Sequence, residues 1–190
     1  NFLENHDEQR FPCPEFGGSV SNEYAPLAVS ALFNTAPFMI YFGEEIGVDA
    51  SESPNGRTTI FDFADIDPLE RLYGYIHGKA SLKPEELDFL ARFWEVMQLA
   101  ASPLKTRGLV YDLCYCNAET PGFDLDRHFA FLRCEEDRVE LFFCNFSAQA
   151  ASVRVNIPQH AYDLLGIGKA VPQDGFPISV GAKDFAHVTV

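Results

Sequence analysis

Apolar and polar residues follow different patterns in the two parts of this 190-residue chain. Up to about residue 104, short unbroken apolar runs alternate with segments whose apolar residues recur every three to four positions, as on one face of a helix. Beyond that point, apolar and polar residues alternate with a period of two between regularly spaced polar turns, which is typical of strands. We therefore expect two parts, residues 1–104 and residues 105–190.

Two helices are expected in the first part. Asn22 is a suitable N-cap for a helix over about residues 23–35, because its side chain can accept a hydrogen bond from a free backbone N–H group; Pro37 stops this helix. Pro84 suits the first position of a second helix, which continues to about residue 101. The predicted apolar faces consist of Leu27, Ala28, Ala31 and Leu32 in the first helix, and of Leu87, Leu90, Ala91, Trp94 and Met97 in the second.

The strands predicted by the pattern differ between the two parts. Residues 38–42 form an unbroken apolar run, which favours a strand buried on both faces, as in a parallel sheet. Residues 48–83 are polar and are expected to form loops. In the second part we expect an antiparallel sandwich, with a hairpin turn at residues 133–138. Its strands are predicted at residues 109–114, 128–134, 139–146, 151–157 and 185–190.

The charge balance excludes several kinds of partner. The chain has 14 Lys and Arg against 28 Asp and Glu, so its formal net charge is −14. This excess of negative charge argues against nucleic acid as a partner and against docking on anionic membranes. The longest apolar run, residues 37–42, is far shorter than the roughly 20 residues that span a bilayer. Hydrophobic residues make up 47% of the chain, which is enough for a packed core.

The cysteines do not suggest disulfide bonds. An odd number of cysteines is not typical of a disulfide framework, and it favours a reducing compartment such as the cytoplasm. A Cys-x-Cys pair is present, but no second Cys or His pair stands at zinc-site spacing, so we expect no metal site. The five residues are Cys13, Cys114, Cys116, Cys134 and Cys144.

The strongest candidate chemistry lies at the beginning of the sequence. The apolar strand end at residues 1–4 leads into Asn5, His6 and Asp7, which places a carboxylate beside an imidazole. In parallel α/β folds, functional side chains gather where strands end. The segment is therefore either a catalytic or ligand-binding pair, or a polar loop without such a role, and so short a motif leaves both interpretations open.

The segment from Phe2 to Asp7, followed by Arg10, resembles the seventh-strand motif of the alpha-amylase family, glycoside hydrolase family 13. In that motif an apolar pair and two variable residues precede Asn-His-Asp. Residues 37–47 are similar to the eighth strand of the family and its Gly-Glu-Glu-containing exit, and residues 56–62 carry a weaker similarity. The resemblance implies the C-terminal part of a TIM (β/α)8 barrel, namely the end of strand seven, helix seven, strand eight and helix eight, followed by an all-β antiparallel sandwich.

The resemblance also implies roles for individual residues. Asp7 matches the carboxylate that stabilises the oxocarbenium-like transition state without forming the covalent bond. His6 matches the histidine that contacts hydroxyls of the sugar, and Asn5 positions its neighbours. Arg10 has two open roles, a substrate-binding residue or a loop-fixing ion pair. The acidic residues after the eighth strand are interpreted as a structural or solvated pair, Glu44 and Glu45.

Two carboxylates that the family's reaction requires do not occur here. Retaining hydrolysis needs a nucleophile and a general acid roughly 5 Å apart, and the family carries them in a Gly-Phe-Arg-x-Asp motif and a following Glu. Neither motif occurs in the 190 residues, and a whole barrel takes about 250 residues. We therefore expect the C-terminal portion of a retaining hydrolase of α-linked glucans (starch, glycogen or maltooligosaccharides) that is inactive alone. Asn1 in place of Met is interpreted as a cut within a longer protein.

Alternatives to this function remain open. Within the family, the parent protein is alternatively an α-glucan transferase. In another class, the chain is a non-catalytic module whose β-sandwich binds sugar or a partner chain, or has a structural role. The aromatic residues available for stacking on sugar are Tyr111, Tyr115, Phe123, Phe129 and Phe143, although burial in the core is the more usual place for such residues.

The resemblance has consequences for cofactors and assembly. We expect no cofactor, because calcium, which is common in the family, takes its ligands from parts that this chain lacks. A barrel that begins at strand seven exposes an apolar helix face and a strand edge. We therefore expect the isolated chain to self-associate through residues 23–47.

Overall fold

The structure is a computed structural model that describes residues 1–49, 59–61 and 64–190. Its helices are α1 (Tyr24–Leu32), α2 (Asp67–Ile76), α3 (Pro84–Ala101), α4 (Pro103–Thr106) and α5 (Gln159–Leu164), with short 3₁₀ helices η1 (Val20–Asn22), η2 (Glu44–Ile46) and η3 (Tyr115–Asn117). Its strands are β1 (Leu109–Asp112), β2 (His128–Glu135), β3 (Arg138–Asn145), β4 (Ala151–Val155), β5 (Phe176–Val180) and β6 (Phe185–Thr189).

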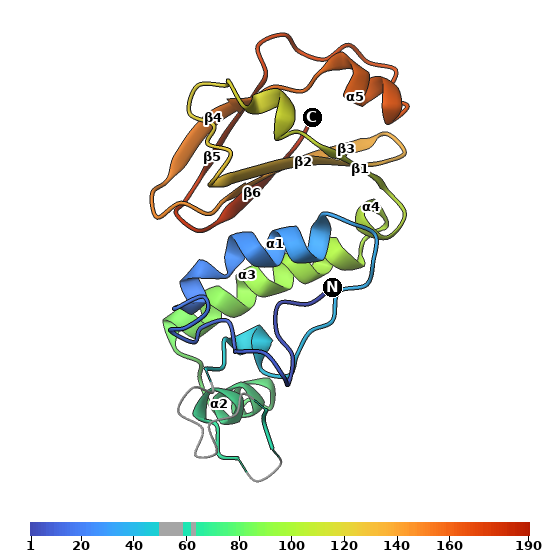
Figure 1. Ribbon diagram of the computed structural model, residues 1–190. Coiled ribbons are helices and arrows are strands. Elements are labelled where there is room, and N and C mark those ends of the chain that lie inside the picture. Colours follow the sequence, from blue (N-terminus) through green and yellow to red (C-terminus); the bar gives the residue numbers. More distant parts are fainter. Residues whose placement is uncertain (50–58, 62–63) are drawn as a thin grey trace.

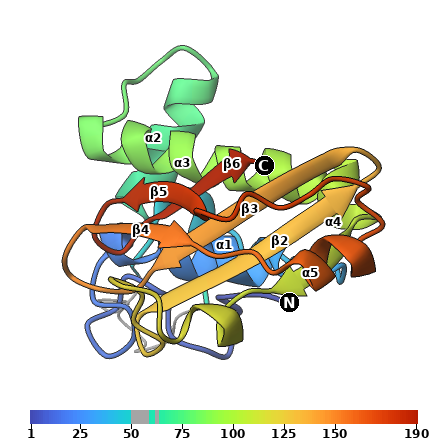
Figure 2. The same cartoon turned by 90° about the horizontal axis from the view of Figure 1, so that it is seen from above.

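The elements form layers that stack along the long axis of the molecule (Figure 1). A four-stranded antiparallel sheet in the order β1-β2-β3-β6 lies between the helices α1 and α3 on one side and the antiparallel pair β4-β5 with α5 on the other. Seen from above, β2 and β3 lie over α1 (Figure 2). No helix in the described part of the chain is long and apolar enough to cross a membrane.

The central strands β2 and β3 are buried on both faces, because each face contributes to a different core. Successive side chains of a strand point to opposite faces. Leu132 and Leu141 therefore pack with β4, β5 and α5. Phe131 and Phe142 point the other way and pack with α1 and α3. Their rings are cross-strand neighbours and stack at 4.9 Å between centroids, which joins β2 to β3 on the face toward the helices.

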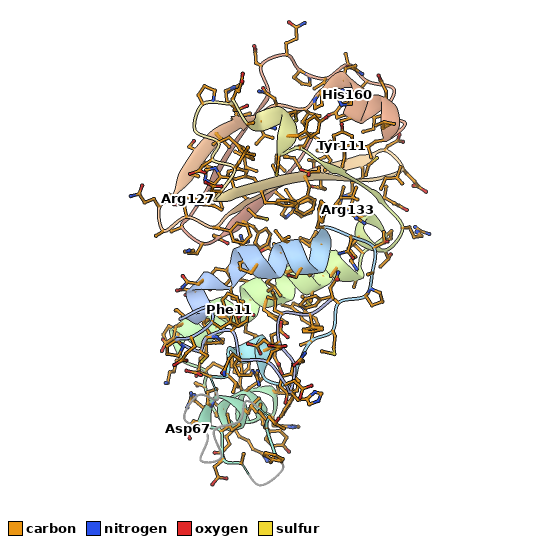
Figure 3. The ribbon with its side chains drawn as sticks, viewed as in Figure 1. Phe11, Asp67, Tyr111, Arg127, Arg133 and His160 are labelled. Atoms are coloured by element: carbon orange, nitrogen blue, oxygen red, sulfur yellow. The ribbon has the colours of Figure 1, made fainter. Side chains whose placement is uncertain are left out.

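A buried arginine joins the end of the helical part to the sheet. Arg133 on β2 is almost completely buried and donates hydrogen bonds to the carbonyl oxygens of Leu104, Lys105 and Gly108. These carbonyls lie in and after α4, where the last carbonyls of a helix have no partner within it. Arg133 lies between the sheet and α4 in Figure 3. The predicted boundary near residue 104 falls at this junction and stays a prediction.

The first helix forms, with a different start from the predicted one. The predicted face from Leu27 to Leu32 is buried, but the helix ends at residue 32 and not near residue 35. The prediction that Asn22 caps it was wrong. Asn22 belongs to η1, and its side-chain amide donates to the carbonyl oxygen of Gly17 at 2.8 Å. Glu23 occupies the N-cap position without a side-chain hydrogen bond.

The second helix has the predicted bounds, but the predicted face was wrong in part: Leu90 and Met97 pack against buried clusters, whereas Leu87, Ala91 and Trp94 are exposed. Pro84 is at its start and Ala101 at its end. The residues that contact α1 and the core are Phe89, Phe93 and Val96, whereas Trp94, on the predicted face, is 60% exposed. Both sets of residues recur at helical spacing, so the choice between them depends on where the neighbouring helix lies.

Neither predicted strand of the first part forms in the described structure. Residues 1–4 and 38–42 are irregular, and Met39, Ile40 and Phe42 are exposed, Phe42 by 59%. The two segments nevertheless meet. The Asn1 amino group donates to the Pro37 carbonyl oxygen at 2.9 Å, and the Met39 N–H donates to the Asn1 carbonyl oxygen at 2.8 Å. Such an alternating pair of bonds occurs between parallel strands.

Several elements were missed by the sequence pattern, among them α2, α4, α5 and β5. The helix α2 lies within residues 48–83, which were predicted to form loops. Residues 50–58 and 62–63 of that segment are outside the described residues, and they include most of the weaker motif at 56–62. The prediction that only strands follow residue 104 was wrong for α5, whose six residues are too few for a periodic signal. The strand β5 was missed because Pro177 lies within it, and proline is tolerated only where a strand has a free edge.

In the second part, the predicted strands are otherwise present. The hairpin between β2 and β3 turns at residues 136–137, with Glu136 at a φ of 53°. Strand β1 ends at Asp112 and β4 at Val155, two residues earlier than predicted in each case.

Candidate functional site

The loop of residues 5–9 presents the candidate catalytic pair at the surface. The His6 Nε2 and Asp7 Oδ2 atoms lie 3.3 Å apart, and the two side chains are 67% and 76% exposed. The structure thus brings together the two residues that the sequence singled out. An exposed carboxylate beside an imidazole can face a developing positive charge and can hydrogen-bond to hydroxyl groups.

The backbone of this loop is held by hydrogen bonds. The Asn5 Oδ1 atom accepts from the N–H groups of Asp7 and Glu8, at 2.7 Å and 2.8 Å, which is the arrangement of an Asx turn. The Thr59 hydroxyl donates to the His6 carbonyl oxygen at 2.9 Å. The side chain of Asn5 therefore fixes where the Asp7 backbone lies.

A buried ion pair closes the base of the loop. The Arg10 Nε atom lies 2.7 Å from the Glu4 Oε2 atom, and the two side chains are 0% and 1% exposed. The other Glu4 oxygen accepts a hydrogen bond from the Phe11 N–H group. Because residues 4 and 10 flank the loop on both sides, their pairing holds its two ends together. Arg10 is thus buried beneath the loop, and of its two open roles the geometry favours the loop-fixing ion pair.

Arg10 also connects the loop to the second motif. Its Nη1 atom donates to the Phe42 carbonyl oxygen at 3.1 Å, and its guanidinium lies 4.8 Å from the centre of the Tyr41 ring. Gly43 has a φ of 89°, and a Cβ atom there would lie 2.9 Å from a Val48 methyl group and 3.3 Å from Arg10. A glycine is therefore required where the second motif turns against the guanidinium.

Two further carboxyl groups are buried close to this ion pair. Glu23 and Glu44 are fully buried, and the Glu44 Oε2 atom accepts from the Tyr41 N–H group at 2.9 Å. Burial raises the pKa of Glu44 to about 8. Burial, together with the charges of Glu4 and Glu44, raises the pKa of Glu23 well above its usual range. Burial likewise raises the pKa of Glu4, although the Arg10 charge opposes this.

One guanidinium therefore faces three carboxyl groups. Within the described residues, both Glu23 oxygens, one Glu44 oxygen and the Arg10 Nη2 atom have no hydrogen-bond partner. The raised pKa values favour the protonated forms of Glu23 and Glu44, which limits the buried negative charge. No pattern in the sequence indicated the burial of Glu23. Glu44 was interpreted from the sequence together with Glu45, which is only half-buried and accepts a hydrogen bond from the Gly43 N–H group.

The described residues do not offer a metal centre. Among them, no group of three or more His, Cys, Asp or Glu side chains could hold a metal ion. All five cysteines are free thiols. The Cys116 thiol donates to the Leu113 carbonyl oxygen at 3.1 Å, so its nearest partner is backbone.

Comparison with known proteins gives matches by structure only. No protein-family model and no curated protein matches the chain. AmyP in complex with maltose matches 99% of the chain with a TM-score of 0.64 and 17% identity, and the chain covers 40% of AmyP. A cyclic α-maltosyl-(1→6)-maltose hydrolase from Arthrobacter globiformis matches all of the chain with a TM-score of 0.59 and 16% identity, and 34% of it is covered.

A third match has the same character. An alpha-amylase from Geobacillus thermoleovorans, complexed with acarbose, matches 99% of the chain with a TM-score of 0.57 and 19% identity, and 38% of it is covered. At such identities the likeness shows the fold. The chain therefore spans well under half of the length of these solved proteins and has the fold of that part.

Proposed function

We propose that this chain, which has the fold of part of the alpha-amylase-family enzymes, is the C-terminal portion of a retaining hydrolase of α-linked glucans. The observation that carries the proposal is the loop of residues 5–9. It exposes His6 and Asp7 side by side above a buried ion pair, and that ion pair also contacts the second motif at Phe42. Two motifs that are over 30 residues apart in sequence thus meet at one site.

The backbone contacts between the two motifs support a barrel origin. Asn1 exchanges hydrogen bonds with Pro37 and Met39 in the manner of adjacent parallel strands, as strands seven and eight of a barrel would. The exposed apolar residues of segment 38–42 are of the kind that a closed barrel buries on both faces. In this proposal α1 and α3 are helices seven and eight, and residues 105–190 form the C-terminal β-domain.

The proposal gives each site residue a physical task. The Asp7 carboxylate faces the positive charge that develops on the sugar ring in the transition state, and His6 hydrogen-bonds to sugar hydroxyls. Asn5 and Arg10 act through the loop backbone and are positioning residues. AmyP was solved in complex with maltose, and its E221Q variant in complex with maltotriose, which supports an α-glucan as the substrate. The chain alone is proposed to be inactive, because hydrolysis needs two further carboxyl groups.

The predicted surface for self-association, residues 23–47, is too wide. The apolar face of α1, at one end of the proposed region 23–47, is buried against α3 and the sheet. The exposed apolar part of that region is segment 38–42. We therefore propose that the isolated chain self-associates through segment 38–42, which the remaining strands of a barrel would cover.

The test replaces Asp7 in the full-length protein that contains this chain. Asp7→Asn keeps the shape of the side chain and removes its charge, so kcat on maltoheptaose should fall by about 10²-fold or more with little change in KM. Asp67→Asn is the matched control, because Asp67 is an exposed carboxylate on α2. A wild-type kcat in Asp7→Asn refutes the role of Asp7, and product analysis separates hydrolysis from transfer to a second glucan. Turnover of maltoheptaose by the purified 190-residue chain refutes its proposed inactivity.

A further inference from the structure

A cluster of three aromatic side chains lies on the β-domain, far from the Asp7 loop. Tyr111 comes from β1, Tyr115 from η3 and His160 from α5. In Figure 3, Tyr111 and His160 lie on the side of the sheet away from the helices, whereas Phe11, which follows the Asp7 loop, lies on the other side of the sheet, at the end of the helix layer. Of the other aromatic residues that the sequence offered for stacking on sugar, Phe123 and Phe143 are buried, so their candidacy was wrong.

The polar atoms of the cluster converge on one point. The Tyr111 Oη atom lies 2.5 Å from the Tyr115 Oη atom, and the His160 Nε2 atom lies 2.6 Å and 2.7 Å from the two hydroxyls. The ring centres are 5.9 Å to 6.4 Å apart. The three rings therefore spread outward from a hydrogen-bonded apex, and contacts between residues distant in sequence hold them in place.

The cluster lies at the surface: Tyr111 is half-buried and packs against the core of the β-domain, whereas Tyr115 and His160 are exposed. Tyr115 is 56% exposed, and its hydrogen bonds to Tyr111 and His160 are also exposed. Fixing an aromatic side chain in one rotamer costs conformational entropy, and exposed hydrogen bonds return only about 1 kcal/mol each. Side chains that are held in place at the surface in this way are preorganised to bind a ligand.

The apolar surface extends beyond the three rings. Leu109 precedes Tyr111 by two residues and shares its face of β1, and Leu164 follows His160 by four residues on the same side of α5. Both leucines are more than half exposed. The elements that carry the rings thus also present exposed apolar side chains, and apolar groups with a few polar atoms among them are the composition of small-molecule sites.

The chemistry of the cluster selects an uncharged ligand. The hydrogen bond with Tyr111 and the partial burial of the ring raise the pKa of Tyr115, so this phenol stays neutral and is a poor ligand for a cation at physiological pH. The net charge of −14 disfavours anionic ligands. A sugar fits the surface, because a pyranose ring has an apolar face for the aromatic rings and hydroxyl groups at its edge for the apex.

We propose that Tyr111, Tyr115 and His160 form a surface site for α-linked glucan chains, separate from the Asp7 site. The choice of an α-linked glucan rests on the proposed function. It agrees with the ring planes of the two tyrosines, which are inclined by 56° to each other. Rings at such an angle follow the curved path of an α-(1→4)-linked chain and not the flat ribbon of a β-(1→4)-linked one. Bound there, a long glucan is held at the protein while another part of it reaches the Asp7 site.

The experiment measures glucan binding by the 190-residue chain in gels that contain amylopectin, and by titration with maltoheptaose. The wild type should bind both, and Tyr115→Ala should bind about tenfold more weakly or worse, as expected for the loss of one stacked ring. Tyr111→Phe keeps the ring and removes one hydroxyl from the apex, so it should bind more weakly than the wild type and more tightly than Tyr115→Ala. Tyr73→Ala removes an equally exposed tyrosine on α2, and it should bind like the wild type. Urea unfolding of each variant verifies that it is folded.

The outcomes separate this site from the Asp7 site. In the full-length protein that contains this chain, Tyr115→Ala should leave kcat on the short substrate maltotriose unchanged, because Tyr115 lies outside the Asp7 site. The proposal is overturned if the wild type does not bind, if Tyr115→Ala binds as tightly as the wild type, or if Tyr115→Ala lowers kcat on maltotriose. Equal binding of cellohexaose overturns the selection of α-linked chains. These binding measurements do not depend on turnover, so a failure of the proposed catalytic role of Asp7 leaves them interpretable.

Discussion

Replacing Arg10 by Met tests the inference that a buried ion pair holds the Asp7 loop. Methionine is close to arginine in length and fills most of its space, but it cannot pair with Glu4. In the native chain the two charged atoms are 2.7 Å apart in side chains that are 0% and 1% exposed. The variant therefore leaves the Glu4 carboxylate buried without its cation, and it also loses the contact of the guanidinium with Tyr41.

The structure sets the size of the expected effect. Removing one partner of a fully buried ion pair costs about 3–5 kcal/mol, and the lost cation–π contact adds about 1 kcal/mol. Domains of this size unfold with roughly 5–15 kcal/mol. We therefore expect Arg10→Met to fold at 25 °C with much less stability than the wild type. The double variant Glu4→Gln/Arg10→Met removes both charges and should recover most of the loss.

The assay is urea unfolding followed by circular dichroism at pH 7 and pH 4.5, for the wild type, both single variants and the double variant. Arg10 stabilises the ionised form of Glu4, so the pair contributes most at pH 7 and its contribution falls as the pH drops and Glu4 takes up a proton. The penalty of Arg10→Met should therefore be smaller at pH 4.5. A penalty below about 1 kcal/mol at pH 7 refutes a buried pair, because exposed pairs have that magnitude. Additive single variants refute the coupling.

Three further predictions concern other parts of the molecule. The pKa of Glu44 is about 8 in the folded chain, against an ordinary value of 4.5. Between these pH values the folded chain therefore holds a proton that the unfolded chain releases. The stability of the wild type should consequently fall as the pH rises from 4.5 to 8. Glu44→Gln should flatten this dependence in urea titrations at several pH values, and an unchanged slope contradicts the assignment. Phe131→Ala should lower the free energy of unfolding by about 3–5 kcal/mol, because Phe131 is fully buried and stacked on Phe142. Phe2→Ala, at a half-exposed position, should lower it by less than about 1 kcal/mol. Equal shifts of the urea midpoint in the two variants contradict the burial of β2 on both faces. Phe42→Asp should shift the chain toward monomer in sedimentation equilibrium by placing a charge in the exposed segment 38–42, and a wild type that is monomeric at every concentration rules out association there.

Local patterns in the sequence were sufficient for the elements whose signals are local. Pro84 begins α3 because proline lacks the N–H group that a first turn leaves unpaired. The apolar runs of β2 and β3, with a polar turn between them, indicated a hairpin, because such runs on both sides of a short polar turn are typical of paired strands. The loop of residues 5–9 was also predictable, since Asn5 turns the backbone through atoms only two and three residues away.

The tertiary structure decided which surfaces meet. On α3 two apolar stripes have the same spacing, and only the position of α1 selects Phe89 and Phe93 over Trp94. Segment 38–42 has the composition of a buried strand, yet it is exposed, because burial depends on neighbouring strands and not on the segment itself. The burial of Glu23 beside Glu4 and the convergence of Tyr111 with His160 join residues 19 and 49 positions apart. Such contacts depend on how the whole chain packs, and spacing along the sequence carries no information about them.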